Sequence, residues 1–240
     1  LVVVGELGIP AMERGARVHT HCTVTGVLRS PDGRVCGVRH RDRLTGQGGE
    51  CRAPVVVNAT GAWASLTATA AGLAPGDTPI RPGKGVHVYF DRRLTNYAVI
   101  VKAIDGRQVF LLPWQNVTVI GTTDDDFYGD PDDVLATTDE IRYLVQAVEG
   151  VFPAVRDARA LSTWAAVRPT LHRWGVKEED LSRDHRIVDH AADGADGLYS
   201  MLGGKLASYR LFAEQMTDRV AARLGNGARC QTHLLALPGG

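Results

Sequence analysis

The chain has 240 residues, 44% of them hydrophobic, and its 27 basic residues balance 27 acidic ones. This size and composition predict one large globular domain or two small ones, and the balanced charge argues against a nucleic-acid-binding protein and against an electrostatic membrane anchor. The apolar runs are too short for a membrane-spanning helix, and the four cysteines have neither CxxC spacing nor nearby histidines, so we predict reduced cytosolic thiols, no disulfide framework and no zinc site.

The first third of the chain predicts a helix, a series of short strands and a second helix. Residues 1–14 predict a helix that ends at Gly15, although two glycines and a proline oppose it. Strands are expected over residues 16–19, 23–29, 35–41 and 51–57. The last three form a meander, because glycine-containing turns separate them. Small residues over 63–71 predict the second helix.

Strands dominate after Gly72, where the composition changes. They are expected over residues 85–90, 98–102, 108–113, 117–121, 161–167, 185–190 and 198–202. Residues 137–148 predict a helix with Thr138 as its cap, and residues 172–184 predict a charged loop. An apolar stripe predicts a last helix directly after Gly204. We therefore predict an outer domain, residues 1–79 and 185–226, interrupted by a β-rich domain, residues 80–184, with 227–240 as a linker.

Glycines follow two apolar runs immediately before a predicted helix. One junction is Asn58-Ala-Thr-Gly61, and the other is Gly203-Gly-Lys205. The free N–H groups at such a helix start suit a phosphate or another electron-rich group, and Lys205 adds a full positive charge. An ordinary tight turn is the alternative for both junctions. The complete GxGxxG fingerprint of dinucleotide-binding loops does not occur.

Basic side chains near two strand ends are candidates for a ligand site. Lys84 and His87 stand at the start of a predicted strand, where both could face a cavity. A surface lysine and a half-exposed histidine are the alternative. Arg168 precedes Pro169, which restrains the backbone and favours a fixed guanidinium that binds phosphate or carboxylate. A structural salt bridge is the alternative for Arg168.

Three consecutive acidic residues end the segment Ile120-Gly-Thr-Thr-Asp-Asp-Asp126. The alternate ligand spacing and the closing glutamate of an EF-hand loop are absent. We therefore predict no metal site here, but a turn that is fixed by hydrogen bonds of Thr122, Thr123 and Asp124.

Six short motifs occur in a fixed order along the chain. They are Val56-Val-Asn-Ala-Thr-Gly61 with Trp63, Lys84-Gly85 with His87, Ile120-Gly-Thr-Thr-Asp124, Val167-Arg-Pro169, Ser182-Arg183 with Val188-Asp-His190, and Gly203-Gly-Lys-Leu206 with Tyr209-Arg210. In this order and spacing they resemble the FAD-dependent glycerol-3-phosphate dehydrogenases of the D-amino-acid-oxidase-like flavoprotein superfamily. Three segments near the end, residues 223–225, 230–232 and 235–239, are similar to the catalytic A subunit of the anaerobic type of these enzymes.

The resemblance implies FAD as the cofactor and a mixed fold, α+β with α/β. A partial FAD-binding Rossmann-like domain would be interrupted by an antiparallel β-rich substrate domain. Val24 would lie near the adenine of FAD. The other cofactor-binding residues would be Ala59, Thr60 and Gly61 on the adenosine side, and Gly203, Gly204, Lys205 and Leu206 at the flavin ring.

The same resemblance implies oxidation of sn-glycerol 3-phosphate to dihydroxyacetone phosphate. Hydride would pass to flavin N5, and electrons would pass to a quinone through partner subunits. Arg168 and Lys205 would hold the substrate, Lys84 would help to bind it, and His87 is the candidate base because imidazole has a suitable pKa. The implied location is the cytoplasm, including the inner face of the cell membrane, where partner subunits would provide the attachment.

The chain differs from the family pattern in ways that affect the expected activity. The GxGxxG loop and the first third of the family's chain are absent, so we expect a piece of a longer protein that alone binds FAD weakly and is inactive. Ala207-Ser208 and Thr170 stand where the family has other residues. Two alternatives stay open: another FAD-dependent amino-acid or hydroxy-acid oxidase or dehydrogenase, since Arg168 can also bind a carboxylate, and a truncated module without catalysis.

Overall fold

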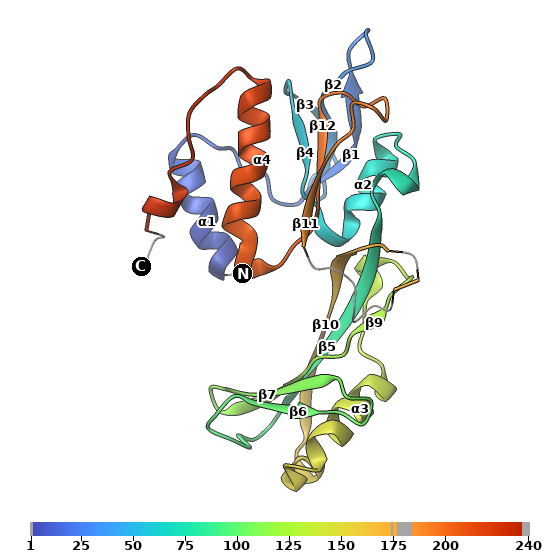
Figure 1. Cartoon of the computed structure of the whole chain (residues 1–240), viewed down its shortest axis with the longest axis vertical. Coiled ribbons are helices and arrows are strands. Elements are labelled where there is room, and N and C mark those ends of the chain that lie inside the picture. The colour runs from blue at the N-terminus through green and yellow to red at the C-terminus, as the bar shows by residue number, and fades with distance from the viewer. Residues whose placement is uncertain (1, 174, 177–183, 237–240) are drawn as a thin grey trace. The chain divides into compact units, whose positions relative to one another are not determined.

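The computed structural model describes residues 2–173, 175–176 and 184–236, and these residues form two compact units (Figure 1). Unit 1 comprises Leu1–Thr60, Ala64–Thr78 and His185–Gly240, and unit 2 comprises Gly61–Trp63 and Pro79–Asp184. The units divide between residues 78 and 79 and between 184 and 185, and Gly61–Trp63 falls in unit 2, whereas residues 1–79 were predicted in the outer domain. Ser182-Arg183 lies outside the described residues, as does most of the predicted loop over 172–184.

Unit 1 contains two three-stranded sheets. The antiparallel meander has the order β1 (Cys22–Arg29), β2 (Val35–Asp42), β3 (Gly48–Arg52). The second sheet has the order β11 (His185–Asp189), β12 (Leu198–Gly203), β4 (Val56–Asn58). In this sheet β11 runs antiparallel to β12, whereas β12 runs parallel to β4. β4 is therefore an end strand whose outer edge is not paired with any described strand.

Three helices belong to unit 1, and they begin and end at sequence signals. α1 (Val2–Glu13) ends before Gly15, whose φ of 93° suits only glycine well, so the predicted C-terminus is confirmed. α2 (Ala64–Ala70) follows the 3₁₀ turn η1 (Gly61–Trp63). α4 (Tyr209–Arg223) starts after the 3₁₀ turn η6 (Leu206–Ser208), later than predicted. Its predicted apolar stripe is mostly exposed, and Met216 is its one buried residue in the described chain.

Two predicted strands of unit 1 were wrong. Residues 16–19 form no strand, because no other segment pairs with them in the described structure. The single strand predicted over 51–57 is divided between β3 and β4, which belong to different sheets. Pro54 lies at the division, where its missing N–H cannot join a sheet ladder.

The described strands of unit 2 form one antiparallel sheet, and helix α3 (Thr138–Glu149) covers one of its faces. Its strand order is β10 (Ala160–Leu171), β5 (Ile80–Phe90), β8 (Val117–Gly121), β7 (Gln108–Trp114), β6 (Val99–Lys102), and the short β9 (Asp125–Asp126) also pairs with β5. Figure 1 shows β5 and β10 side by side over their whole length, in agreement with their register from Ile80↔Leu171 to Phe90↔Ala160. β10 extends beyond the predicted range because β5 pairs with it along its length, apart from a bulge at Leu161.

The core of unit 2 lies between this sheet and α3. Every second residue of β5 enters it, beginning with Val86 and Val88, which are both fully buried. Leu144 and Val148 meet them from the helix. The cap of α3 is Thr137 and not the predicted Thr138. Thr137 and Glu140 form a reciprocal capping box, in which each side chain accepts the other's backbone N–H.

Candidate active site

The two glycine junctions of unit 1 come from neighbouring parallel strands. Leu198 pairs with Val56 and Ser200 with Asn58, so β12 and β4 point in the same direction. Their carboxyl ends therefore lie at one edge of the sheet, where open α/β sheets bind their ligands. The structure thus brings together the region of Asn58-Ala-Thr60 and that of Gly203-Gly-Lys-Leu206.

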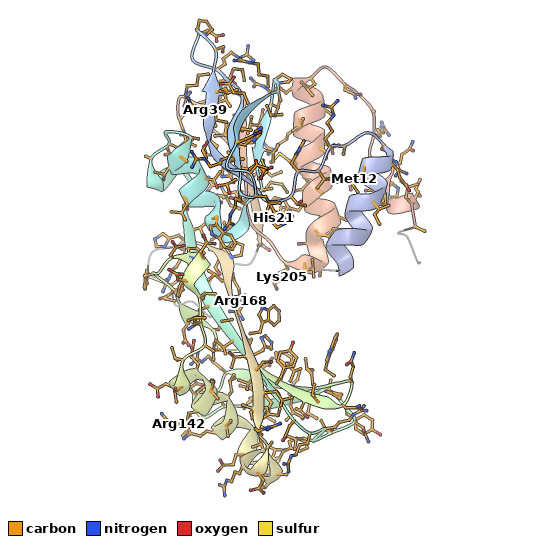
Figure 2. All side chains as sticks on the ribbon, turned by 180° about the vertical axis from the view of Figure 1, so that it is seen from behind. Met12, His21, Arg39, Arg142, Arg168 and Lys205 are labelled. Atoms are coloured by element: carbon orange, nitrogen blue, oxygen red, sulfur yellow. The ribbon has the colours of Figure 1, made fainter. Side chains whose placement is uncertain are left out.

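The Gly203–Lys205 turn offers several hydrogen-bond donors. Gly203 and Gly204 have φ values of 72° and 94°, a left-handed conformation that favours glycine. No protein acceptor within the described part of the chain meets the backbone N–H groups of Gly204 and Lys205. Lys205 is exposed at the start of η6 and α4 (Figure 2), and its ammonium forms no ion pair with a described residue. This donor set fits the carbonyl edge of a flavin ring or another electron-rich group.

A pocket of about 300 Å³ lies beside β4 in unit 1. Four consecutive residues of the chain, Val55–Asn58, line it, together with apolar residues of the meander. Two of the predicted cofactor-binding residues, Val24 and Thr60, contribute to its wall, whereas Ala59 and Gly61 do not. Apolar side chains with a few polar groups at one end fit a nucleoside.

Unit 2 presents a second group of site residues on the face of its sheet opposite α3. Paired residues of neighbouring strands lie on the same face, and His87 pairs with both Trp164 of β10 and Gly121 of β8. The imidazole stacks on the indole at a centroid distance of 5.2 Å. Arg168 of β10 (Figure 2) points to the same face, where it approaches Gly85. The structure therefore brings His87 and Arg168 together.

The guanidinium of Arg168 is held by the turn that follows β8. It donates to Asp124 Oδ1 at 2.8 Å, to Thr122 Oγ1 at 2.9 Å and to the carbonyl of Thr123 at 3.2 Å. The turn is itself fixed, because Thr123 Oγ1 accepts the N–H of Val86 at 3.0 Å. The predicted hydrogen-bonded turn is confirmed. The salt-bridge interpretation of Arg168 also has support, since Asp124 is an ion-pair partner.

Two physical effects favour the neutral form of His87. Burial of the ring, and secondly the positive charge of Arg168, lower the pKa of His87 from its ordinary value. A neutral imidazole at pH 7 can accept a proton. This side chain therefore meets one requirement for a general base.

Two glycines make room for the basic side chains on this face. A Cβ atom at Gly121 would lie 2.3 Å from Cδ2 of His87, and one at Gly85 would lie 2.3 Å from Nη2 of Arg168. Side chains cannot approach a real Cβ so closely. Both strands therefore need glycine where the imidazole and the guanidinium lie against the sheet.

We expect Gly85→Ala to displace Arg168 from its partners in the turn and to destabilise unit 2 by ~1–3 kcal/mol, because overpacking forces neighbouring groups apart. Gly150→Ala is a matched control in the same unit, since its backbone is helical and a Cβ there would meet no atom within 4 Å. Urea unfolding followed by tryptophan fluorescence measures the stability of both variants. Equal midpoints for the two variants would contradict the steric argument.

Lys84 differs from the sequence expectation. It lies on the opposite face of β5 from His87, because the two residues are three positions apart in a strand. Its ammonium donates to Glu140 Oε2 at 2.8 Å, and the Lys84 residue is only 8% exposed. The expectation that Lys84 and His87 line one cavity is therefore wrong.

Sequence reasoning missed several residues of these sites. The partners Asp124 and Thr122 were predicted to form a turn, but their contact with Arg168 spans more than forty positions and depends on strand register. Trp164 was not predicted as a site residue. It lies in the strand expected over 161–167, four residues before Arg168, and this spacing puts both on one face because β10 extends to Leu171. No group of three or more potential metal ligands occurs among the described residues.

Comparison with known proteins identifies the family. The model of the family of FAD dependent oxidoreductases (DAO) matches residues 3–210. The chain belongs to this family. FAD is therefore confirmed as the cofactor to which the family's fold is adapted, and the donors around Lys205 fit it. The predicted fold class is confirmed as the mixed α/β fold of this oxidoreductase family, with antiparallel sheets.

The resemblance to glycerol-3-phosphate dehydrogenases is also confirmed. The A subunit of the anaerobic glycerol-3-phosphate dehydrogenase of Escherichia coli is 37% identical, and the match covers 96% of this chain and 42% of that protein. The A1 subunit of the Haloferax volcanii enzyme is 35% identical over 95% of this chain and 40% of its own. The chain thus spans about two fifths of the length of these relatives.

A solved family member has the same architecture. The crystal structure of the glycerol-3-phosphate dehydrogenase from Bacillus halodurans, which is complexed with FAD, superimposes with a TM-score of 0.83 at 31% identity. The match covers 98% of this chain and 45% of that one. Among the described helices, none has the length and apolar character needed to cross a membrane.

Proposed function

We propose that this chain is the part of a FAD-dependent glycerol-3-phosphate dehydrogenase that carries the flavin-side turn and the substrate-binding sheet. The observation that carries this proposal is the 37% identity to the E. coli protein over almost the whole chain. The reaction is the oxidation of sn-glycerol 3-phosphate to dihydroxyacetone phosphate. Partner subunits then pass the electrons to a quinone, and they provide attachment to the inner face of the cytoplasmic membrane.

Each unit contributes its own residues to this reaction. FAD, when bound, supplies the hydride acceptor. In unit 1, Lys205 and the N–H groups of the Gly203–Lys205 turn place positive potential beside the flavin ring, with Leu206 next to them. Val24, Asn58 and Thr60, which line the pocket beside β4, would hold the adenosine part.

In unit 2, Arg168 binds the substrate phosphate through its planar fork of N–H groups. Asp124 and Thr122 restrain the guanidinium, so that less conformational entropy is lost when the phosphate binds. His87 removes the proton of the reacting hydroxyl, because its lowered pKa leaves the ring neutral at pH 7.

A carboxylate substrate is the second candidate, because a guanidinium binds both anions. A substrate panel with the full-length protein distinguishes the two. We expect reduction of the flavin by sn-glycerol 3-phosphate and none by 2-hydroxy acids or amino acids. Turnover of an acid without turnover of glycerol 3-phosphate would overturn the proposed substrate and leave the proposed cofactor in place.

We expect the 240-residue chain alone to bind FAD weakly and to lack activity. Among the described strands none pairs with the outer edge of β4, and the sequence contains no GxGxxG loop to hold the pyrophosphate. The test is an absorbance spectrum after incubation with FAD and desalting. A flavin band near stoichiometric occupancy would refute this expectation, and recovery of the band in the full-length protein would support it.

A further inference from the structure

A chain of hydrogen bonds with a buried middle part runs through unit 1 from Asp193 to Thr60. His190 Nδ1 lies 2.8 Å from Asp193 Oδ2, and His190 Nε2 lies 2.8 Å from Ser200 Oγ. Asn58 Nδ2 donates to Ser200 Oγ at 3.3 Å. Asn58 Oδ1 accepts from the hydroxyl and the backbone N–H of Thr60, at 2.7 and 3.3 Å. The chain thus connects β12 to the end of β4.

The partners determine the direction of every bond in this chain. Asn58 Nδ2 also donates to the carbonyl of Ala64 at 2.9 Å, and this contact fixes the orientation of the amide. Ser200 Oγ therefore accepts from Asn58, and its own hydrogen is free for His190 Nε2. The imidazole consequently carries its proton on Nδ1, which donates to Asp193. With these directions every donor named here has an acceptor, and Thr60 Oγ1 also lies 3.0 Å from Thr67 Oγ1.

Burial determines what the network can do. His190 and Ser200 are fully buried and Asn58 is 3% exposed, whereas the side chain of Asp193 is 30% exposed. The order Asp193–His190–Ser200 is that of a nucleophilic triad, but no substrate can reach a fully buried hydroxyl. His190 and Ser200 can still position other groups, because a buried network in which every polar group is hydrogen-bonded fixes the groups that it joins.

The group that the network fixes lies at the proposed cofactor site. Asn58 holds the backbone and hydroxyl of Thr60 on one side and the start of α2, through Ala64, on the other. Both Asn58 and Thr60 line the pocket beside β4. We propose that His190 and Ser200 are positioning residues that hold the Asn58–Thr60 turn in the conformation that receives the adenosine part of FAD. The last part of this inference rests on the proposed function.

Hydrogen–deuterium exchange of the 240-residue chain tests the positioning role without any cofactor. We expect Ser200→Ala to accelerate exchange of the Thr60 amide roughly tenfold or more, because Asn58 loses a buried acceptor. Ser65→Ala is the matched control, since it removes a half-buried hydroxyl that donates to the carbonyl of Thr78 at 2.9 Å in the same unit but is not part of the network. Equal exchange at Thr60 in the wild type and in Ser200→Ala would overturn the inference.

The role of His190 is tested by a conservative pair. His190→Gln keeps an acceptor within reach of the Ser200 hydroxyl and should retain most of the protection at Thr60, whereas His190→Leu should not. Equal losses of protection at Thr60 in both variants would show that packing of the imidazole ring matters, and would exclude a role of His190 as hydrogen-bond acceptor. In the full-length protein, the dissociation constant of FAD should rise roughly tenfold in Ser200→Ala and stay unchanged in Ser65→Ala. If the wild type does not bind FAD, the proposed function fails while the exchange result still decides the positioning role.

Discussion

Replacement of Lys84 by methionine is expected to destabilise unit 2 by ~3–5 kcal/mol, because it leaves Glu140 without its cation in a largely buried position. The side chains of Lys84 and Glu140 are only 10% and 13% exposed. Glu140 also accepts the N–H of Thr137, so the same carboxylate joins β5 to the capped end of α3. Chemical denaturation of the variant and the wild type measures the difference.

The double variant Lys84→Met/Glu140→Gln provides the control for charge. Glutamine keeps the capping interaction and carries no charge, so we expect it to recover most of the lost stability. Lys102→Met is the control for loss of an exposed lysine, and it should change the free energy of unfolding by less than about 0.5 kcal/mol. A Lys84→Met variant of normal stability but with a raised KM for the substrate would instead support the original binding role.

The pH dependence of this difference follows from the ion pair. Burial alone would raise the pKa of Glu140, but the hydrogen bonds from Lys84 and Thr137 outweigh it and the pKa is lowered. The stabilisation is therefore complete above the carboxyl's ordinary pKa and is lost as the pH falls through the lowered pKa of the folded state. The deficit of Lys84→Met should accordingly be largest at neutral pH and shrink in acid.

Local signals in the sequence predicted most elements of the fold. The helix expected over 137–148 is found one residue later, because its apolar spacing and the pair of Thr137 and Glu140 are local. The predictions of secondary structure failed where an element depends on a distant partner strand or on a single backbone group. Residues 16–19 have strand-like composition but no partner among the described segments, and Pro54 interrupts a run that otherwise favours a strand. β10 is longer than predicted because β5 pairs with it on both sides of a bulge at Leu161.

The sites were predictable as separate motifs, but not as assemblies. Proline after Arg168 and the threonine–aspartate turn were each recognised, while their contact depends on how three strands are aligned. The face of β5 on which Lys84 lies follows from strand periodicity, and counting from His87 would have separated the two residues. The His190 network could not be inferred, because its members come from two segments that are adjacent only in the folded sheet.

Replacement of Trp164 by leucine in the full-length protein is expected to move the acid limb of the pH–rate profile to higher pH. Burial is the larger cause of the lowered pKa of His87, and the stacked indole of Trp164 covers one face of the imidazole. A less covered ring ionises more easily, so the pKa of His87 rises towards its ordinary value of 6.5. Since the base must be neutral, the rate at pH 6 should fall, while the rate on the alkaline plateau should change little.

Two further variants make this result specific to His87. His87→Ala should lower kcat/KM by about 10²–10⁴ and abolish the acid limb, because the group that titrates is gone. Trp114→Leu removes another exposed indole of unit 2, 61% exposed, and should leave the profile unchanged. Replacement of Arg168, the second cause of the lowered pKa of His87, is a less suitable test because it would also weaken phosphate binding. An acid limb that stays in place in Trp164→Leu and survives in His87→Ala would assign the base to a different residue, and the stacked pair would then serve the packing of the sheet face alone.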